Sequence, residues 1–384
     1  MQKLIRITTV PLSLEKLLEG QLTFMQNHFE VTAVSDDKGR LLKYGRNNGV
    51  ATFHLELTRK ITPFKDLKAV FNLYKFLLKE KPLIVHSHTP KAGIVGMMAA
   101  YFAKVPLRLH TVAGLPLMEA TGLKRKILNT VEKWTYKFAT NVYPNSKGLY
   151  DFIKTESFCP SHKLKVLGKG STNGIDTSYF DPTHFAKTNL LIEKEKWNIP
   201  ANDFVFVFVG RIVADKGMHE MVGAFLEVQK LYKNVSLVLV GPFEDELDPL
   251  QPATKEAIKT NSKIVHAGYQ NDVRPFLALS SALIFPSYRE GFPNVVLQAG
   301  AMGLPSIVSD INGCNEIITQ DENGIIIPVK NQKATQEAMI KLLSDNQYYA
   351  KLQKNTRSSI TKNYDRQEMW QYLLNEYALL RAKL

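Results

Sequence analysis

Cysteines and long apolar runs are both scarce in this sequence of 384 residues. Its two cysteines, Cys159 and Cys314, cannot build a disulfide framework and lack the spacing of a metal site, so a reducing compartment is expected. The longest apolar run, Ala92–Ala103, is bounded by lysines and is too short to span a bilayer. The first residues, MQKLIRITTV, are typical of a strand and not of a cleaved leader. A soluble or peripheral protein is therefore expected.

Two common phosphate-binding patterns are also absent. There is no Asp-x-Asp pair, which argues against metal-dependent sugar transfer, and no Gly-Lys-Ser/Thr loop, which argues against an ATPase. The glycines of Gly168-Lys169-Gly170 and Gly174 are spaced as in dinucleotide sites, but the residues after them do not form a helical pattern. No metal and no redox cofactor are expected.

The net charge of +13 is concentrated in the first half of the chain. Residues 1–190 contain 28 Lys and Arg against 14 Asp and Glu, whereas residues 191–384 contain 21 against 22. This asymmetry favours an anionic partner for the first half, either a phosphate-bearing acceptor on an acidic membrane surface or nucleic acid. A solvated basic surface without a partner is the alternative.

Apolar runs alternate with helical patterns along almost the whole chain, which predicts parallel sheets covered by helices on both faces. The alternation stops over 176–202, where Asp181-Pro182 and Ile199-Pro200 occur, so two α/β domains of doubly wound, Rossmann-like type are expected, facing each other across a cleft. The predicted limits are 1–180, 181–365 and a last helix over 366–384 that returns to the first domain. Within the first domain, one helix over about 13–27 and a strand over 165–167 are predicted.

The stretch 282–309, ALIFPSYREGFPNVVLQAGAMGLPSIVS, is central to the prediction. Two short apolar runs flank a loop and a brief helical pattern, and Pro293 suits the start of a helix over 294–302. Glu290 would then stand just before a helix N-terminus, where unpaired N–H groups favour a phosphate. A carboxylate at this place suits sugar hydroxyls.

This stretch resembles the Glu-x7-Glu signature of the retaining, nucleotide-sugar-dependent glycosyltransferase family 4, with Gln298 in place of the second Glu. Gly210-Arg211 with Lys216, His86–Gly93 (HSHTPKAG) and Asn173–Asp176 (NGID) are similar to other landmarks of that family. The resemblance covers nearly the whole chain and is nearest to the capsular-polysaccharide and lipid-linked-oligosaccharide branch. It implies the GT-B fold.

The resemblance also implies roles for individual residues of the second half. Arg211 and Lys216 hold the donor diphosphate and stabilise charge on the leaving nucleotide, and Glu290 contacts the donor sugar. Gln298 stands where the family's Glu binds the ribose, and an amide offers one acceptor and one donor there. The backbone of Gly210 and of the residues after Glu290 completes the donor site: Gly291, Phe292, Pro293 and Asn294.

The first half offers weaker candidates. His110 lies near the family's cleft histidine, but the residue before Gly114 is Ala113, so His110 is either catalytic or a packed strand-end residue. His86 and His88 bracket Ser87 at a strand end, and His88 and Lys91 are candidates for acceptor binding, with a structural role as the alternative. Thr9 and Ser13, at the first strand-to-helix turn, are candidates for the acceptor diphosphate.

A basic helix is predicted over about 124–138. One side of it carries an apolar stripe, and lysines and arginine surround that stripe: Leu123, Ile127, Val131, Trp134 and Phe138, with Lys124, Arg125, Lys126, Lys133 and Lys137. Such a helix lies in a membrane interface or turns its stripe into the protein core.

The predicted function is transfer of a sugar from a nucleoside diphosphate, with retention, to a polyprenyl-diphosphate-linked saccharide at the cytoplasmic face of a bacterial inner membrane. Capsule or O-antigen assembly is the expected context, with the anionic membrane surface as partner and no nucleic acid. One alternative is a nucleotide-sugar epimerase or hydrolase on the same fold. Another is a non-catalytic protein whose basic half binds membranes or nucleic acid.

Overall fold

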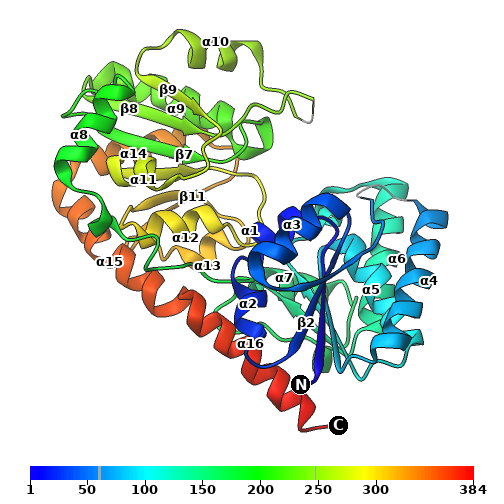
Figure 1. Ribbon diagram of the computed structural model, residues 1–384. Coiled ribbons are helices and arrows are strands. Elements are labelled where there is room, and N and C mark those ends of the chain that lie inside the picture. The colour runs from blue at the N-terminus through cyan, green and yellow to red at the C-terminus, as the bar shows by residue number, and fades with distance from the viewer. Residues whose placement is uncertain (59–61, 247) are drawn as a thin grey trace. The chain divides into compact units, whose positions relative to one another are not determined.

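The chain forms two compact units in the computed structural model, which describes residues 1–58, 62–246 and 248–384 (Figure 1). The first unit is Met1–Asn173 with Arg366–Leu384, and the second is Gly174–Asp365. The chain therefore changes unit after Asn173, whereas the sequence pattern predicts the boundary after residue 180. The physical reason is that Ile175 already pairs with Asp365, and Phe180 is buried in the core of the second unit.

The first unit is built on a parallel six-stranded sheet in the order β3-β2-β1-β4-β5-β6. The chain builds outward from β1 to β3, then returns to the other side of β1 with β4, so the strand order reverses between β1 and β4. Ligands of such sheets bind at the carboxyl ends of the strands beside this reversal. The strands are β1 (Lys3–Ile7), β2 (Glu30–Ser35), β3 (Ala51–His54), β4 (Ile84–His88), β5 (Leu107–Val112) and β6 (Asn141–Pro144).

Helices cover both faces of this sheet, because side chains of a strand point alternately to either side. Leu4 packs in one core cluster with the C-terminal helix, and Ile5 packs in the other with the helices that follow β3 and β4. Figure 1 shows the second group stacked side by side on one flank of the sheet. The helices on the side of Ile5 are α4 (Pro63–Glu80), α5 (Pro90–Phe102) and α6 (Gly122–Phe138), with α7 (Lys147–Thr155) beside β6. The helices on the side of Leu4 are α1 (Pro11–Lys16), α2 (Gln21–Met25), α3 (Lys38–Asn48) and α16 (Arg366–Arg381).

Two local predictions for the first unit were wrong, and one helix was missed. The helix expected over 13–27 is divided into α1 and α2, because Gly20 adopts a left-handed φ of 74° against the ring of Trp370. The strand expected over 165–167 is absent, and only Leu164 forms an isolated bridge, to Val142. The helix that was missed is α3.

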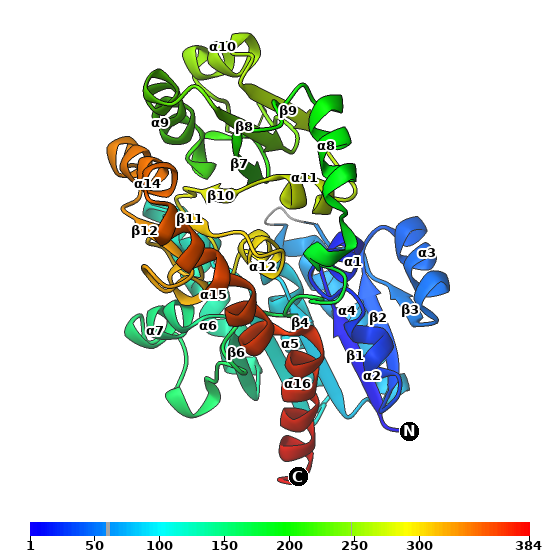
Figure 2. The same cartoon turned by 90° about the vertical axis from the view of Figure 1, so that its left-hand side faces the viewer.

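The second unit repeats the architecture, with the parallel order β12-β11-β10-β7-β8-β9 and a reversal between β7 and β10. Figure 2 shows α9 and α14 on one side of this sheet and α8 and α11 on the other. The strands are β7 (Phe204–Val209), β8 (Val235–Val240), β9 (Ile264–Gly268), β10 (Ala282–Phe285), β11 (Ser306–Ser309) and β12 (Gly324–Ile327). The helices are α8 (Lys187–Lys196), α9 (Met218–Leu231), α10 (Pro252–Thr260), α11 (Arg274–Leu279), α12 (Asn294–Ala301), α13 (Cys314–Ile317), α14 (Gln332–Ser344) and α15 (Asn346–Tyr364).

The strands of the second unit are nearly continuous apolar runs, as expected for parallel strands that are covered on both faces. All residues of β8, β10 and β11 are buried. In the part of the chain that the structure describes, no helix is both long and apolar enough to cross a membrane.

Candidate active site

Lys216 and Glu290 meet at the strand-order reversal of the second unit. Lys216 follows β7 in the loop before α9, Glu290 follows β10, and the Lys216 Nζ lies 2.5 Å from the Glu290 Oε1. Their side chains are 14% and 18% exposed, so the pair is partly shielded but still reachable. The Ser287 hydroxyl donates to the same carboxylate oxygen at 3.1 Å. A cation and a carboxylate are thus held together at the edge where parallel sheets bind ligands.

The two loops that carry this pair are fastened to each other. The Tyr288 backbone N–H donates to the Asp215 carbonyl at 2.9 Å, and the Arg289 guanidinium pairs with the Asp215 carboxylate at 3.0 Å. Gly217 makes the close approach possible, because a Cβ there would lie 2.1 Å from the Pro286 carbonyl oxygen. Fixed loops of this kind hold charged groups in place before a ligand arrives.

The loop from Glu290 leads into α12, as predicted, with Pro293 at the N-cap and Asn294 as the first helical residue. Asn312 braces this turn, since its side-chain amide donates to the carbonyls of Glu290 at 3.2 Å and Gly291 at 2.6 Å. Phe292 is buried, with its ring 5.6 Å from that of Tyr364. The N–H groups at the start of α12 remain oriented along the helix axis toward its N-terminal end.

Gln298 lies one turn along α12 from Asn294 and is half-buried. Within the described residues its side-chain amide has no hydrogen-bond partner, so its acceptor and its donor are both available to a ligand.

Arg211 is placed differently from Lys216. It follows Gly210 at the end of β7, is more exposed, and its Nη1 donates to Glu244 at 3.0 Å. Gly210 itself is packed against Gly241, where an added Cβ would lie 1.8 Å from the Gly210 carbonyl oxygen. The structure therefore brings Lys216 to Glu290 but pairs Arg211 with a different carboxylate.

Cys314 lies close to this site, but its thiol is not a reactive nucleophile. Burial, and then the negative charge of Glu290, raise the pKa of the Cys314 thiol well above its usual range. A thiolate nucleophile is therefore disfavoured there.

The carboxyl ends of β1 and β4 form the corresponding place in the first unit. The Thr9 and Thr89 hydroxyls lie 2.7 Å apart across the strand-order reversal. Thr89 has a φ of 94°, which is rare for a β-branched residue and typical of strained functional positions. Of the other predicted acceptor residues, Lys91 pairs with Asp66 at 2.5 Å, and Ser13 lies half-buried in α1.

The histidines at the end of β4 face α16. His86 is fully bonded: its Nδ1 lies 2.6 Å from the Tyr377 hydroxyl and its Nε2 lies 2.8 Å from the Thr111 hydroxyl. Arg6 donates to the same Tyr377 oxygen at 2.9 Å, so this hydroxyl links the Arg6 guanidinium to the His86 ring. Burial, followed by the charge of Arg6, lowers the pKa of His86 well below its usual range, so the imidazole is neutral.

His88 differs from its neighbour. It is 1% exposed, and neither ring nitrogen has a partner among the described residues. Its ring stacks on that of His86 with the centroids 4.3 Å apart, and it borders a cavity of about 20 Å³ together with Thr111, Asn145 and Ser171. That volume suits a single water molecule, so the cavity beside His88 is too small for a larger ligand.

His110 lies on the opposite face of the sheet, among α5 and α6. Its Nδ1 lies 2.8 Å from the Ser87 hydroxyl, and Gly93 packs so closely that a Cβ would lie 2.6 Å from the imidazole. Burial lowers the pKa of His110 to about 4, so its imidazole is neutral at physiological pH. The geometry is that of a packed residue, which was the alternative left open by the sequence.

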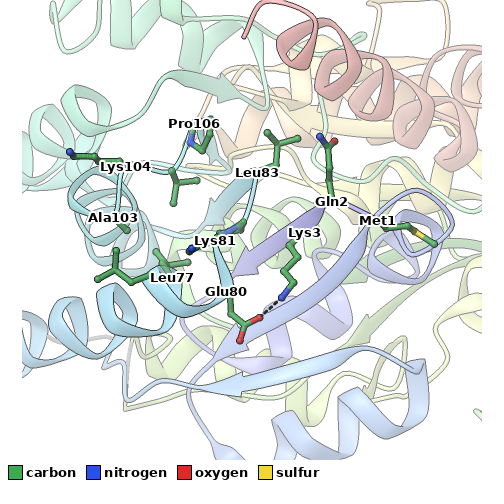
Figure 3. Close-up of a pocket in the computed structure, with 13 residues that line it drawn as sticks. Met1, Gln2, Lys3, Leu77, Glu80, Lys81, Leu83, Ala103, Lys104 and Pro106 are labelled. Carbon is green, nitrogen blue, oxygen red and sulfur yellow. Dashed lines mark hydrogen bonds and ion pairs between the residues drawn. The ribbon is translucent and has the colours of Figure 1, made fainter.

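A pocket of about 660 Å³ lies at the other edge of the same sheet, where β1, β4 and β5 begin (Figure 3). Apolar residues from the ends of α4 and α5 line it, together with Lys3, which pairs with Glu80 at 2.7 Å. Because parallel sheets bind ligands at the carboxyl ends of their strands, this pocket is not the candidate active site. No group of three or more metal-ligating side chains is found in residues 1–58, 62–246 and 248–384.

Some residues of the site were not predicted. Asp215, Ser287 and Asn312 hold the loops around Glu290 through hydrogen bonds to backbone groups, and no spacing in the sequence indicates such contacts. Gly217 did carry a signal, since a glycine directly after a predicted lysine ligand suggests a close backbone approach.

The comparison with solved structures gives the fold, which is GT-B. Anabaena Alr3699/HepE in complex with UDP aligns with a TM-score of 0.82 at 16% identity, covering 98% of this chain and 100% of that chain. Sucrose-phosphate synthase from Thermosynechococcus elongatus aligns with a TM-score of 0.81 at 17% identity, covering 100% of both chains. The protein is therefore of the GT-B class.

The sequence comparisons give the family. Residues 24–170 match the glycosyl transferase 4-like domain, and residues 191–359 match glycosyl transferases group 1. The capsular polysaccharide biosynthesis glycosyltransferase CapM of Staphylococcus aureus is 32% identical over 377 residues, which is 98% of this chain and 97% of that protein. An Escherichia coli UDP-Gal:α-D-GlcNAc-diphosphoundecaprenol α-1,3-galactosyltransferase is 31% identical over 344 residues, 88% of this chain and 86% of that protein. The chain belongs to this family of GT4-like, group 1 glycosyltransferases, and it is a glycosyltransferase.

Proposed function

We propose that this glycosyltransferase moves a sugar from a nucleoside diphosphate to a hydroxyl of a polyprenyl-diphosphate-linked saccharide, with retention of the anomeric configuration. The reaction serves bacterial surface-polysaccharide assembly, such as capsule or O-antigen, at the cytoplasmic face of the cell membrane. The transferred group is a hexosyl or N-acetylhexosaminyl residue. No metal ion takes part.

The contact between Lys216 and Glu290 carries this proposal. A diphosphate placed at the reversal of the second sheet meets the Lys216 ammonium, the Arg211 guanidinium and the free N–H groups at the start of α12. Glu290, beside Lys216, accepts hydrogen bonds from sugar hydroxyls, and Gln298 binds the ribose. These fixed positive groups stabilise the charge that develops on the leaving diphosphate, which is the task of a metal ion in other transferases.

Bond changes follow the same-face mechanism that is generally drawn for this family. The acceptor oxygen forms a bond to the anomeric carbon, while the bond from that carbon to the diphosphate oxygen breaks. The acceptor proton passes to an oxygen of the leaving phosphate, so no protein base is required. Neutral, buried His110 is compatible with this scheme, because the scheme assigns it no proton.

Support for the acceptor comes from relatives and from the charge of the first half. The E. coli relative is named for a diphosphoundecaprenol-linked acceptor, and a Campylobacter jejuni protein that is 28% identical over 340 residues is named for another. The basic excess within residues 1–190 suits such a phosphate-bearing lipid and an anionic membrane surface. The proposed acceptor contacts at the strand-order reversal of the first sheet are Thr9, Thr89 and Lys91. Ser13 and His88 are the two further residues of the proposed acceptor site.

The test begins with thermal shift against a panel of nucleoside-diphosphate sugars, followed by turnover with a polyprenyl-diphosphate-linked saccharide. Lys216→Ala and Arg211→Ala are each expected to lose about 2–4 kcal/mol of transition-state stabilisation, or about 30- to 1000-fold in rate. Lys341→Ala is the matched control, because Lys341 forms an exposed pair with Asp321 in the same unit. Near-normal rates in both site variants contradict the assignment, and release of nucleotide without acceptor favours the hydrolase alternative. The anomeric configuration of the product, measured by NMR, tests retention.

A further inference from the structure

The predicted apolar stripe of α6 faces outward. Leu123 and Trp134 are 74% and 52% exposed, and Ile127 is exposed as well. The buried residues of this helix are Glu132, Thr135 and Tyr136. Two of the three side chains that α6 buries are therefore polar, and of its apolar stripe only Phe138 packs against the core of the first unit.

The neighbouring helix α4 carries a second exposed apolar stripe. Phe64 and Phe71 are 90% and 53% exposed, and Leu67 and Leu78 are exposed with them. Successive positions are three, four and seven residues apart, so the four side chains lie along one side of the helix. The opposite side is the one that packs on the core, with Ala69, Val70, Leu73 and Leu77 buried. Like α6, α4 has more apolar surface than folding uses.

Both stripes belong to the same layer, because α4 and α6 each pack against α5, and Figure 1 shows the three helices together on one flank of the sheet. At the end of α5, exposed Tyr101 and Phe102 meet α6, with the Tyr101 ring 5.1 Å from the Phe138 ring and the Trp134 ring 6.2 Å from the Phe138 ring. We name this surface the outer face. It comprises Phe64, Leu67, Phe71, Leu78, Tyr101, Phe102, Leu123, Ile127 and Trp134.

Lysines are interspersed with these apolar side chains. The Lys75 Nζ lies 4.4 Å from the centre of the Phe71 ring. The carboxylates of the two helices do not offset this charge, because Asp66 and Glu80 of α4 pair with Lys91 and Lys3, and Glu132 of α6 is buried. The exposed lysines on these helices are Lys65, Lys68, Lys75, Lys79, Lys124, Lys126, Lys133 and Lys137.

We propose that the outer face is the surface by which the protein docks on an anionic lipid bilayer, with α4 lying at the lipid headgroups beside α6. Aromatic and leucine side chains enter the boundary between headgroups and acyl chains, while the lysines extend to the lipid phosphates. A protein partner fits less well, since the buried centre of a protein interface is depleted in lysine, whereas here lysine alternates with phenylalanine along α4. The membrane as partner rests on the proposed function; the identity of the docking face does not.

The test is co-sedimentation with phosphatidylcholine vesicles that do or do not contain phosphatidylglycerol, at low and high salt. The triple variant Phe64→Ser, Leu67→Ser, Phe71→Ser is expected to bind the anionic vesicles at least about tenfold more weakly than the unchanged protein, because each side chain removed takes away apolar burial in the lipid. Leu191→Ser with Ile192→Ser is the matched control, since both residues are exposed on α8 of the second unit. That control is expected to bind as the unchanged protein does.

A charge variant makes the test independent of any folding defect. Lys65→Glu with Lys68→Glu keeps every apolar residue and is expected to weaken binding to anionic vesicles at low salt, with a smaller effect at high salt. Unchanged binding in both α4 variants overturns the proposal, as does loss of a dimer in the triple variant, which would make the outer face a contact between copies. Turnover is measured separately with a short-chain, water-soluble acceptor. Absence of turnover in the unchanged protein counts against the proposed function, whereas the vesicle result decides the docking face.

Discussion

Neutralising the Lys216–Glu290 pair should separate its role in stability from its role in donor binding. Three variants are compared with the unchanged protein: Lys216→Met, Glu290→Gln and the double variant. Each single change leaves one charged group, at 14% or 18% exposure, without its partner. After Lys216→Met, the hydrogen bond that the Glu290 carboxylate retains within the described residues is the one from the Ser287 hydroxyl, at 3.1 Å. The single variants are therefore expected to be less stable than the double variant.

The magnitude follows from the contact. A hydrogen bond between charged groups contributes about 1.5–3 kcal/mol, and for a domain of this size a loss of about 2 kcal/mol lowers the Tm by about 4–8 °C. The double variant has no unpaired charge, so its free energy of unfolding is expected to return to within about 1 kcal/mol of the unchanged protein. Donor affinity should not return with it, because neither the cation for the diphosphate nor the carboxylate for the sugar is restored.

Thermal unfolding gives the stabilities, and calorimetry with the nucleoside-diphosphate sugar gives the affinities. Lys341→Met is the control, and its half-exposed pair with Asp321 is expected to contribute no more than about 1 kcal/mol. Strictly additive stability changes would show that the two groups are not coupled. Unchanged donor affinity in all three variants would remove the pair from the donor site.

Three further predictions concern ribose binding, metal dependence and pH. The free energy of donor binding by Gln298→Glu should lie within about 1–2 kcal/mol of that of the unchanged protein, since a carboxylate accepts from both ribose hydroxyls. Gln298→Ala should bind the donor more weakly, as measured by calorimetry. Equal donor affinity of the Ala variant would place Gln298 away from the ribose. Turnover should persist in EDTA, and loss that manganese or magnesium restores would refute a mechanism based on side-chain cations. Burial raises the pKa of Glu132 to about 7, so the folded state binds this proton more tightly than the unfolded state does. Stability should therefore fall as the pH rises from about 4.5 to 7, by at most about 3 kcal/mol, and Glu132→Gln should remove that part of the pH dependence in unfolding measurements.

The second sheet was predictable because its strands are buried on both faces. The strand β7, FVFVFV, is a continuous apolar run, as is typical of a covered parallel strand. The helix α8 was missed for the opposite reason: none of its residues is buried, so it has no apolar stripe to reveal it. The break between α1 and α2 depends on the left-handed φ of Gly20. The sequence pattern does not reveal whether a glycine within a helical stretch adopts such a φ.

The site was predictable where a motif spans a single loop and not where separate loops meet. Glu290 and the start of α12 are adjacent in the sequence, whereas Asp215 and Asn312 reach the same loop from other strand ends. The sequence also left open which side of α6 faces inward. Hydrophobic patterning favours an inward apolar side, and the burial of Glu132 reverses that expectation.

The return of α16 to the first unit has a consequence for the order of folding. Tyr377 of this helix is the partner of both Arg6 and His86, and residues of α16 complete one of the two cores on the first sheet. On the ribosome, every residue of Gly174–Asp365 emerges before α16, so the second unit has its complete sequence while one core of the first unit still lacks the residues of α16. The first unit is therefore translated first but can complete its folding only after α16 has emerged. In a chain that stops before residue 366, the buried Arg6 lacks the Tyr377 hydroxyl as its hydrogen-bond partner.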